Sequence, residues 1–317
     1  MLHAQTWNSQ IWLCGWYKAT STRGGDSRPM LQKVFRHNLE IFADGAYRTE
    51  SDAVVTLPDR ADYVPQAEMF STPIALASDY VKKETAIQVL NRDCILVAQD
   101  MVGQGLNPAL LNMASLYHPG GGVLDGSSAQ EEDLCRRSTL AVSLYQFSLT
   151  GGRHGDLASM VGVSRRDSRY PMDNMYGGIY SPGITFFRGT RDDGYALSDS
   201  PFRAAVISVA SLNYNPKHGH STLVDGNIPD NDKAVIREKI RTILRIGALK
   251  GHDSLVLGAL GCGAFCTPPA QMARLFHRVL DEPEFQGRFG RIAFAITDTP
   301  NSNNFKPFFQ EFKWKER

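Results

Sequence analysis

Three consecutive glycines are followed within ten residues by two adjacent glutamates. The glycines are Gly120, Gly121 and Gly122, and the glutamates are Glu131 and Glu132. Because glycine weakens regular structure, a triplet indicates a place where bare backbone is needed. The segment between fits a capping box, formed by Ser127 with Gln130 or by Ser128 with Glu131. We therefore predict a strand, a glycine loop and then a helix that begins near residue 129.

The two glutamates cannot both face one reacting atom if they lie on a helix, because consecutive helical side chains point about 100° apart. This spacing differs from the facing pair of carboxylates in most glycosidases. One reading is that a single glutamate does chemistry while its neighbour orients a hydroxyl group. The other is that both carboxylates only stabilise a helix N-terminus electrostatically. The spacing alone leaves both readings open.

A second glycine loop, LGCGAF, follows the apolar run SLVLGA and precedes a helix whose N-cap we expect at Thr267. Both loops would present N–H groups ahead of a helix N-terminus, an arrangement that binds phosphate oxygens. Two such loops favour a bound diphosphate, although each loop alone also fits a tight strand-to-helix turn. The motifs of nucleotide triphosphatases and dinucleotide oxidoreductases are absent from the sequence. Leu260 stands where a nucleophile elbow at Cys262 would need glycine, so we interpret Cys262 as a loop residue.

The remaining patterns predict an α/β sandwich with a central, parallel or mixed sheet. We expect helices over residues 31–45, 79–90, 231–249 and from 267. Apolar, β-branched runs indicate strands at residues 94–98, 109–114, 183–187, 204–210, 254–259 and 291–297. We interpret residues 1–90 as an N-terminal helical layer and residues 91–317 as the core. The glycine-rich segment 150–180 carries four arginines and shows neither the helical nor the strand repeat of apolar residues. It is either a loop on the surface or a basic lid over a ligand.

Composition excludes some classes of protein. The 34 Lys and Arg residues nearly balance 33 Asp and Glu, so an acidic ligand must be held by a local site. Five scattered cysteines suit a reducing compartment, and no apolar run is long enough to span a bilayer. With no recognisable signal peptide, we expect an intracellular, soluble protein.

The glycine triplet, a gap of seven residues and then Gln130-Glu131-Glu132 resemble the signature of the poly(ADP-ribose) glycohydrolases. The segments LLNMAS, YSPGITFFRG, LGALGCGAF and LQKVFRHNLEIFADGAY resemble the microbial-type branch of that family. The matching segments extend from about residue 31 to residue 297. The resemblance implies a three-layer α/β/α macrodomain fold with an N-terminal helical addition. It also implies hydrolysis of the ribose–ribose glycosidic bonds of poly(ADP-ribose).

The resemblance also implies roles for individual residues. Glu132 would be the catalytic acid and Glu131 would hydrogen-bond ribose hydroxyls. The expected substrate-binding residues are Asn112 at the distal ribose, Asp100 at adenine, and Gly120, Gly121 and Gly122 at the diphosphate and terminal ribose. The set also includes Val123 and Gln130, and Gly261, Cys262, Gly263, Ala264 and Phe265 in the second loop. Val123 stands where the family usually has an aromatic residue, and His118 also departs from the pattern, which affects substrate fit more than chemistry.

No cofactor or metal is expected, because the histidines form no ligand framework. The expected partners are poly(ADP-ribose) or ADP-ribosylated proteins and the product ADP-ribose, with no membrane and no stable protein partner, so we expect a monomer. The alternatives are a mono-ADP-ribosyl hydrolase and a non-catalytic ADP-ribose reader. An intact Gln-Glu-Glu sequence argues against the reader, and the periodic apolar stretches that end in glycine loops argue against an interaction scaffold.

Overall fold

The structure, a computed structural model, describes residues 6–22, 24–298 and 302–313. The chain groups into two compact units, each built from separate segments. We call residues up to 67, 117–171 and 181–203 the helical unit, and residues 68–116, 172–180 and those from 204 onward the sheet unit. These segments do not follow the division at residue 90, and the predicted folding domains stay a prediction.

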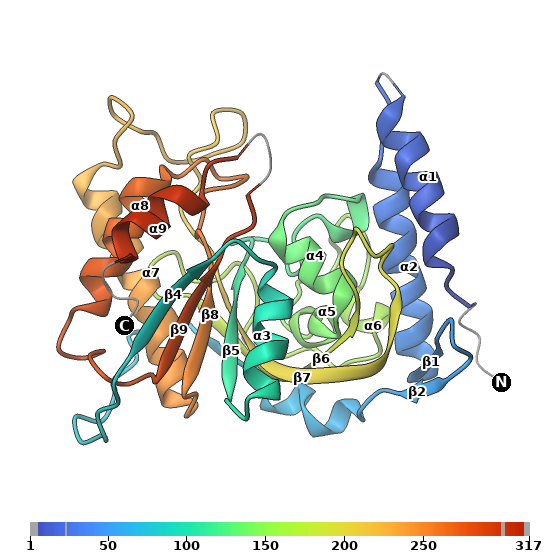
Figure 1. Cartoon of the computed structure of the whole chain (residues 1–317), viewed down its shortest axis with the longest axis horizontal. Helices are drawn as coiled ribbons and strands as arrows, with labels where there is room; N and C mark the ends of the chain where they lie inside the picture. Colours follow the sequence, from blue (N-terminus) through green and yellow to red (C-terminus); the bar gives the residue numbers. More distant parts are fainter. Residues whose placement is uncertain (1–5, 23, 299–301, 314–317) are drawn as a thin grey trace. The chain divides into compact units, whose positions relative to one another are not determined.

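The sheet unit is built on a seven-stranded sheet with the order β3-β6-β7-β5-β8-β9-β4 (Figure 1). The strands from β7 to β4 are parallel neighbours, whereas β3 pairs antiparallel with β6. The mixed sheet of the predicted α/β fold is therefore confirmed. The strands are β3 (Glu68–Phe70), β4 (Ala86–Leu90), β5 (Pro108–Met113), β6 (Gly178–Arg188), β7 (Leu197–Val209), β8 (Ser254–Leu257) and β9 (Arg291–Ala295). Strands β6 and β7 continue into the helical unit.

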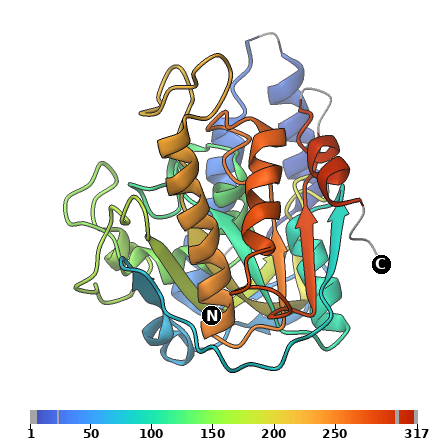
Figure 2. The same cartoon turned by 90° about the vertical axis from the view of Figure 1, so that its left-hand side faces the viewer.

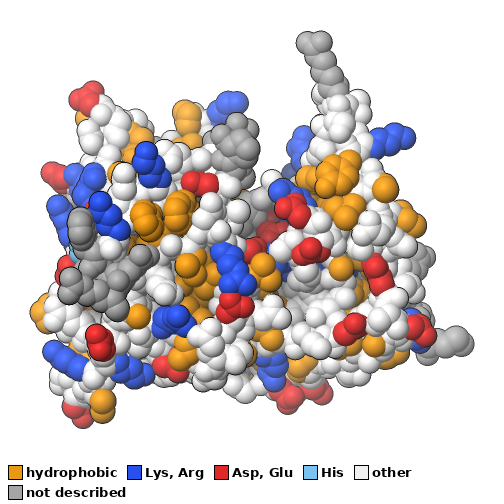
Figure 3. Space-filling view, in the orientation of Figure 1, with side chains coloured by type: hydrophobic (Ala, Val, Ile, Leu, Met, Phe, Trp, Pro, Cys, Tyr) orange, Lys and Arg blue, Asp and Glu red, His pale blue; other side chains and the backbone are white. Residues whose placement is uncertain are grey.

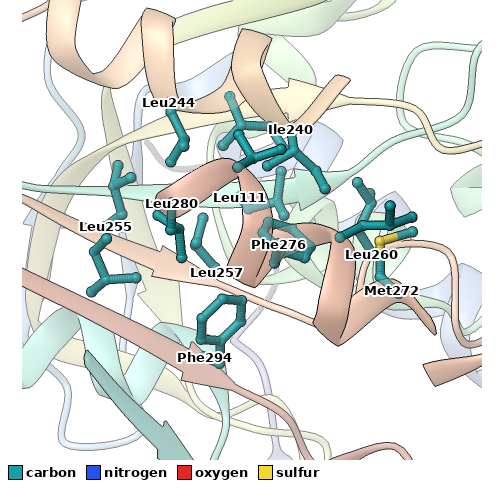
Figure 4. Close-up of a cluster of buried hydrophobic side chains, with 14 of the residues drawn as sticks. Leu111, Ile240, Leu244, Leu255, Leu257, Leu260, Met272, Phe276, Leu280 and Phe294 are labelled. Carbon is teal, nitrogen blue, oxygen red and sulfur yellow. The ribbon is translucent and has the colours of Figure 1, made fainter. Parts of the chain in front are cut away.

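Helices cover both faces of the sheet within the sheet unit. Helices α7 (Asp230–Leu249) and α8 (Pro269–Leu280) share one apolar core with the strands (Figures 2 and 4), where Leu111 of β5 lies among Ile240, Leu257 and Phe276. Leu110, which precedes Leu111 in β5, points to the opposite face of the sheet. Helix α3 (Cys94–Gly103) packs against β5, β8 and β9. Helix α9 (Phe305–Phe312) packs on α8 and β4.

Two predicted elements of the sheet unit are wrong. Residues 94–98 form the start of α3 instead of a strand, because the Asp93 side chain accepts hydrogen bonds from the N–H groups of Ile95 and Leu96 and caps a helix. Residues 79–90 are not helical and end in strand β4. The other predicted strands and the helices near residues 31–45, 231–249 and 267 are confirmed within a few residues.

The helical unit contains the N-terminal helix that was predicted near residues 31–45. Its elements are α1 (Ser9–Ser21), α2 (Arg28–Asp44), the hairpin of β1 (Ala46–Arg48) and β2 (Val54–Thr56), η1 (Arg60–Asp62), η2 (Val64–Gln66), η3 (Val123–Asp125), α4 (Gln130–Arg137), α5 (Leu140–Tyr145) and α6 (Leu157–Met160). Gly45 caps the C-terminal end of helix α2. Its left-handed conformation lets its N–H donate to the carbonyl of Ile41. One face of α2 is buried, while Ile11 and Tyr17 of α1 are exposed, and hydrophobic side chains are visible over the two helices in Figure 3.

Candidate active site

The glycine triplet folds into a chain of tight turns that only glycine adopts readily. Gly120 and Gly121 both have left-handed backbones, with φ of 74° and 57°. The Gly121 N–H donates to the carbonyl of His118 at 3.0 Å, and the Val123 N–H donates to the carbonyl of Gly120 at 3.2 Å. Two of the three glycine N–H groups are thereby turned towards the start of α4.

The carboxylates of α4 accept those two N–H groups. Glu131 Oε1 accepts from the Gly120 N–H at 3.2 Å, and Glu132 Oε1 accepts from the Gly122 N–H at 2.8 Å. Both glutamates are buried. The N-cap of α4 is Ala129 and no side chain caps this helix, so the predicted start is confirmed and the predicted capping box is wrong. Both glutamates therefore bind the glycine loop.

The close approach of these carboxylates explains why the loop is made of glycine. A Cβ atom at Gly121 would overlap Glu132 Oε1 and would lie 3.0 Å from Glu131 Oε2. A Cβ atom at Gly122 would overlap the Ser127 hydroxyl. The loop therefore cradles the two carboxylates, and its N–H groups are engaged by protein oxygens rather than open to phosphate.

An uncharged wall lies behind Gly120. A Cβ atom there would lie 3.3 Å from Tyr145 Cε1 and 3.4 Å from Cys135 Sγ. Burial, with a smaller contribution from Glu131, raises the pKa of the Cys135 thiol, and burial also raises the pKa of Tyr145 and Tyr170. The thiol and the two phenols therefore stay neutral at physiological pH.

The second glycine loop belongs to the sheet unit and follows strand β8. Gly261 is left-handed, with φ of 74°, and its carbonyl accepts from the Thr267 N–H at 3.0 Å. A Cβ atom there would lie 2.5 Å from Ser211 Oγ and 2.6 Å from Thr267 Oγ1. In contrast to the first loop, Gly263 and Ala264 are exposed residues, and their N–H groups make no hydrogen bond within the described residues. This loop can offer backbone donors to an anion.

Thr267 does not cap α8, which corrects the sequence prediction. The N-cap of α8 is Pro268, and the Thr267 hydroxyl is buried with no hydrogen-bond partner in the described part of the chain. Burial raises the pKa of the Cys262 thiol, so a reactive thiolate is not populated there at neutral pH. Cys262 is a loop residue by this geometry.

Comparison with known proteins finds one family and several solved structures that are similar to the chain. The family model of the catalytic domain of microbial-type PARG matches residues 36–189. The solved structure of poly(ADP-ribose) glycohydrolase from Thermomonospora curvata is 29% identical with a TM-score of 0.70, over 89% of this chain and 99% of that one. The chain is similar to the microbial-type poly(ADP-ribose) glycohydrolases in sequence and in fold.

Several of the similar structures hold ligands. The Thermomonospora curvata enzyme bound to the inhibitor ADP-HPD is 29% identical, with a TM-score of 0.69, over 89% of this chain and 99% of that one. The Deinococcus radiodurans enzyme in complex with ADP-ribose is 26% identical, with a TM-score of 0.61, over 83% of this chain and 100% of that one. No curated protein sequence matches the chain.

The residues that the family signature marks fall into both units. The helical unit brings together the glycine triplet, Val123, which is buried in η3, and the first turn of α4 from Gln130 to Glu132. The sheet unit holds Asn112 near the end of β5 and residues 261–265 after β8. Because β5 and β8 are parallel neighbours, Asn112 and the loop lie at the same edge of the sheet. The Asn112 side chain is fully buried and donates to Ser208 Oγ at 2.9 Å.

Asp100 lies away from that edge, within helix α3. Its half-exposed carboxylate forms an ion pair with Arg92. Asp93, which the sequence reasoning did not select, stands in the turn between the carboxyl end of β4 and α3. The available signal was an aspartate placed directly before a helix, which the strand interpretation of residues 94–98 hid. A role for Asp100 at adenine stays a prediction.

Among the described residues, no cluster of three or more His, Cys, Asp or Glu side chains is arranged to hold a metal ion. None of the helices in the described ranges is long and apolar enough to cross a membrane. Part of segment 150–180 is anchored in the helical unit, where the Arg166 guanidinium donates to the carbonyls of Pro65 and Ala67 at 2.6 and 2.9 Å.

Proposed function

We propose that this protein is a poly(ADP-ribose) glycohydrolase, which hydrolyses the ribose–ribose O-glycosidic bonds of poly(ADP-ribose) and releases ADP-ribose. Support comes from the matching family model and from similar solved structures in complex with ADP-ribose or with ADP-HPD. The glycine loop that cradles two carboxylates supports a catalytic site rather than a reader, because a binding module has no need of a buried acid.

The observation that carries the proposal is the difference between the two oxygens of Glu132. Oε1 accepts the Gly122 N–H at 2.8 Å, so this oxygen presents a lone pair to the loop. Oε2 is buried and has no hydrogen-bond partner among the described residues. Because Oε1 already faces the hydrogen of the Gly122 N–H, it cannot point a hydrogen of its own in that direction. A proton carried by the Glu132 carboxyl group therefore lies on Oε2. Glu132 thus has one oxygen that fixes its position and one that is available for proton transfer.

The chemistry assigned to Glu132 follows from that division. Its Oε2 proton is transferred to the ribose oxygen that leaves as the glycosidic C–O bond breaks, through an oxocarbenium-like transition state. The resulting carboxylate takes a proton from water, whose oxygen bonds to the anomeric carbon. Glu132 ends the cycle protonated, having acted first as acid and then as base. Glu131, held by the Gly120 N–H, would orient ribose hydroxyls.

The sheet unit would supply binding rather than chemistry. The N–H groups of the second loop that make no hydrogen bond within the described residues support contacts with the diphosphate, with Phe265 packing on the ribose and Asn112 at the distal ribose. Because the N–H groups of the first loop are engaged by Glu131, Glu132 and His118, the proposed contact of that loop with the substrate is with its bare Cα atoms.

The test measures release of free ADP-ribose from poly(ADP-ribose) and, in parallel, from a mono-ADP-ribosylated protein. Release from the polymer supports the proposal. Release from the modified protein alone would make the chain a mono-ADP-ribosyl hydrolase. Tight ADP-ribose binding without release from either substrate would leave a reader and overturn the proposal.

A further inference from the structure

The C-terminal end of α4, the helix that carries the two glutamates, is finished by side chains instead of by a regular cap. The helix stops abruptly because Ser138 is extended, with φ of −151°. The Ser138 hydroxyl donates to the carbonyl of Leu134 at 2.7 Å. The next two carbonyls, those of Cys135 and Arg136, accept from Asn38 Nδ2 at 3.4 and 2.7 Å. A buried helix end must satisfy its last carbonyls, and here one asparagine of α2 provides two of those bonds.

Asn38 is held in turn by a buried arginine. Asn38 is fully buried, and its Oδ1 accepts from Arg188 Nε at 2.7 Å. The same guanidinium donates to the carbonyl of Tyr195 at 2.8 Å and contacts His37 Nδ1 at 2.5 Å. It also lies over the ring of Trp7, 4.6 Å from the ring centre. Arg188 is therefore fixed from several sides in one orientation.

A second link joins the same arginine to the middle of α4. Tyr195, whose carbonyl accepts from Arg188, donates its hydroxyl to Asp133 Oδ1 at 2.8 Å. Asp133 also accepts from Arg137 at 3.0 Å through its other oxygen. Arg188 thus acts on α4 at two separate points, through Asn38 and through Tyr195.

We propose that Asn38 and Arg188 are positioning residues for catalysis, which fix the C-terminal end of α4 so that Glu132 at its opposite end stays in the glycine cradle. This inference rests on the proposed function. The guanidinium polarises the Asn38 amide, which then donates more strongly to the negative end of the α4 dipole. Because α4 is only eight residues long, about 12 Å at 1.5 Å per residue, a tilt at one end displaces the other. A misplacement of about 1 Å at a reacting group costs roughly a hundredfold in rate.

The decisive variant is Asn38→Asp. It keeps the size of the side chain and an oxygen for Arg188, but it replaces the amide donor with an oxygen that faces the carbonyls of Cys135 and Arg136. We expect kcat on poly(ADP-ribose) to fall by about tenfold to a hundredfold at a temperature where the variant is folded. ADP-ribose affinity should change by less than about threefold, because the binding groups are not altered. Amide hydrogen exchange should accelerate across α4.

The matched control is Gln146→Glu. Gln146 is also buried in the helical unit and donates from its amide to two carbonyls, those of Val64 and Ser143, at 3.1 and 2.8 Å. Neither carbonyl belongs to α4. We expect Gln146→Glu to lower the melting temperature while kcat stays within about twofold of wild type.

A second variant, Arg188→Lys, keeps the test decisive if Asn38→Asp does not fold. Lysine retains the charge but cannot reproduce the forked contacts to Asn38, Tyr195 and His37. Its kcat should fall with little change in KM. Wild-type kcat in either folded variant, or an equal loss of kcat in Gln146→Glu, would overturn the inference. If wild-type protein releases no ADP-ribose, the proposed function fails first and the inference falls with it.

Discussion

The glycine cradle makes a sharp prediction for Gly121→Ala. The added methyl group would overlap Glu132 Oε1 and come within 3.0 Å of Glu131 Oε2, so both carboxylates must move. Two costs follow. The left-handed backbone, with φ of 57°, costs about 1–2 kcal/mol for alanine. Loss of the hydrogen bond from Gly122 to Glu132 leaves a donor and an acceptor without their partner, which costs about 1–3 kcal/mol.

The two costs are expected to appear in different measurements. The backbone strain lowers the free energy of unfolding, whereas the displaced carboxylate lowers kcat. A loss of about 1–3 kcal/mol in positioning corresponds to a fall in kcat of roughly fivefold to a hundredfold. The assays are urea unfolding and steady-state release of ADP-ribose from poly(ADP-ribose).

Gly251→Ala provides the control for the backbone strain. Gly251 has a left-handed backbone too, with φ of 73°, and an added Cβ there meets no atom within 4 Å. The variant Gly251→Ala should lose about 1–2 kcal/mol in the free energy of unfolding and keep the kcat of wild type. If Gly121→Ala loses stability to the same extent and also keeps wild-type kcat, the reasoning about the cradle is refuted.

Two further predictions concern buried titratable groups. Burial lowers the pKa of Lys239 to about 8 from 10.5, and its amine has no hydrogen-bond partner in the described residues. Between these pH values the unfolded chain binds more protons, so this group adds about 3 kcal/mol of stability as pH rises from 8 to 10.5. Lys239→Met should lack that rise in the free energy of unfolding and should be more stable than wild type at pH 7. The measurement is denaturant unfolding across this pH range, and parallel pH profiles for Lys239→Met and wild type would contradict the prediction. For Cys262→Ala we expect kcat within about twofold of wild type, since the raised pKa of the thiol leaves no nucleophile, and a tenfold loss would show that the thiol takes part.

The sequence contained enough information to locate the first glycine loop but not its hydrogen bonds. The glycine triplet and the start of α4 are local patterns, so both could be predicted. The pairing of Glu131 with Gly120 and of Glu132 with Gly122 depends on two consecutive left-handed residues that turn the N–H groups towards the helix. A capping box uses the same residue types, and the sequence does not distinguish the two arrangements.

The misassigned segment at residues 94–98 has a different cause. Its five residues, CILVA, are apolar and too few for helical and strand periods to be separated. The deciding group is Asp93, whose side chain accepts from two N–H groups of the first helical turn. The support of α4 could not be predicted at all, because Asn38 and Arg136 are 98 positions apart in the chain.

The most direct test of the central claim compares Glu132→Gln with Glu131→Gln. Both substitutions keep the side-chain size and an oxygen that can accept the loop N–H. In Glu132→Gln, however, the group at the Oε2 position is an amide nitrogen, which has no acidic proton to transfer. We predict that Glu132→Gln binds ADP-ribose like wild type while release from poly(ADP-ribose) falls by about two to four powers of ten, and that Glu131→Gln loses less. Release by Glu132→Gln at the wild-type rate, or a larger loss in Glu131→Gln, would contradict the assignment of Glu132 as the acid.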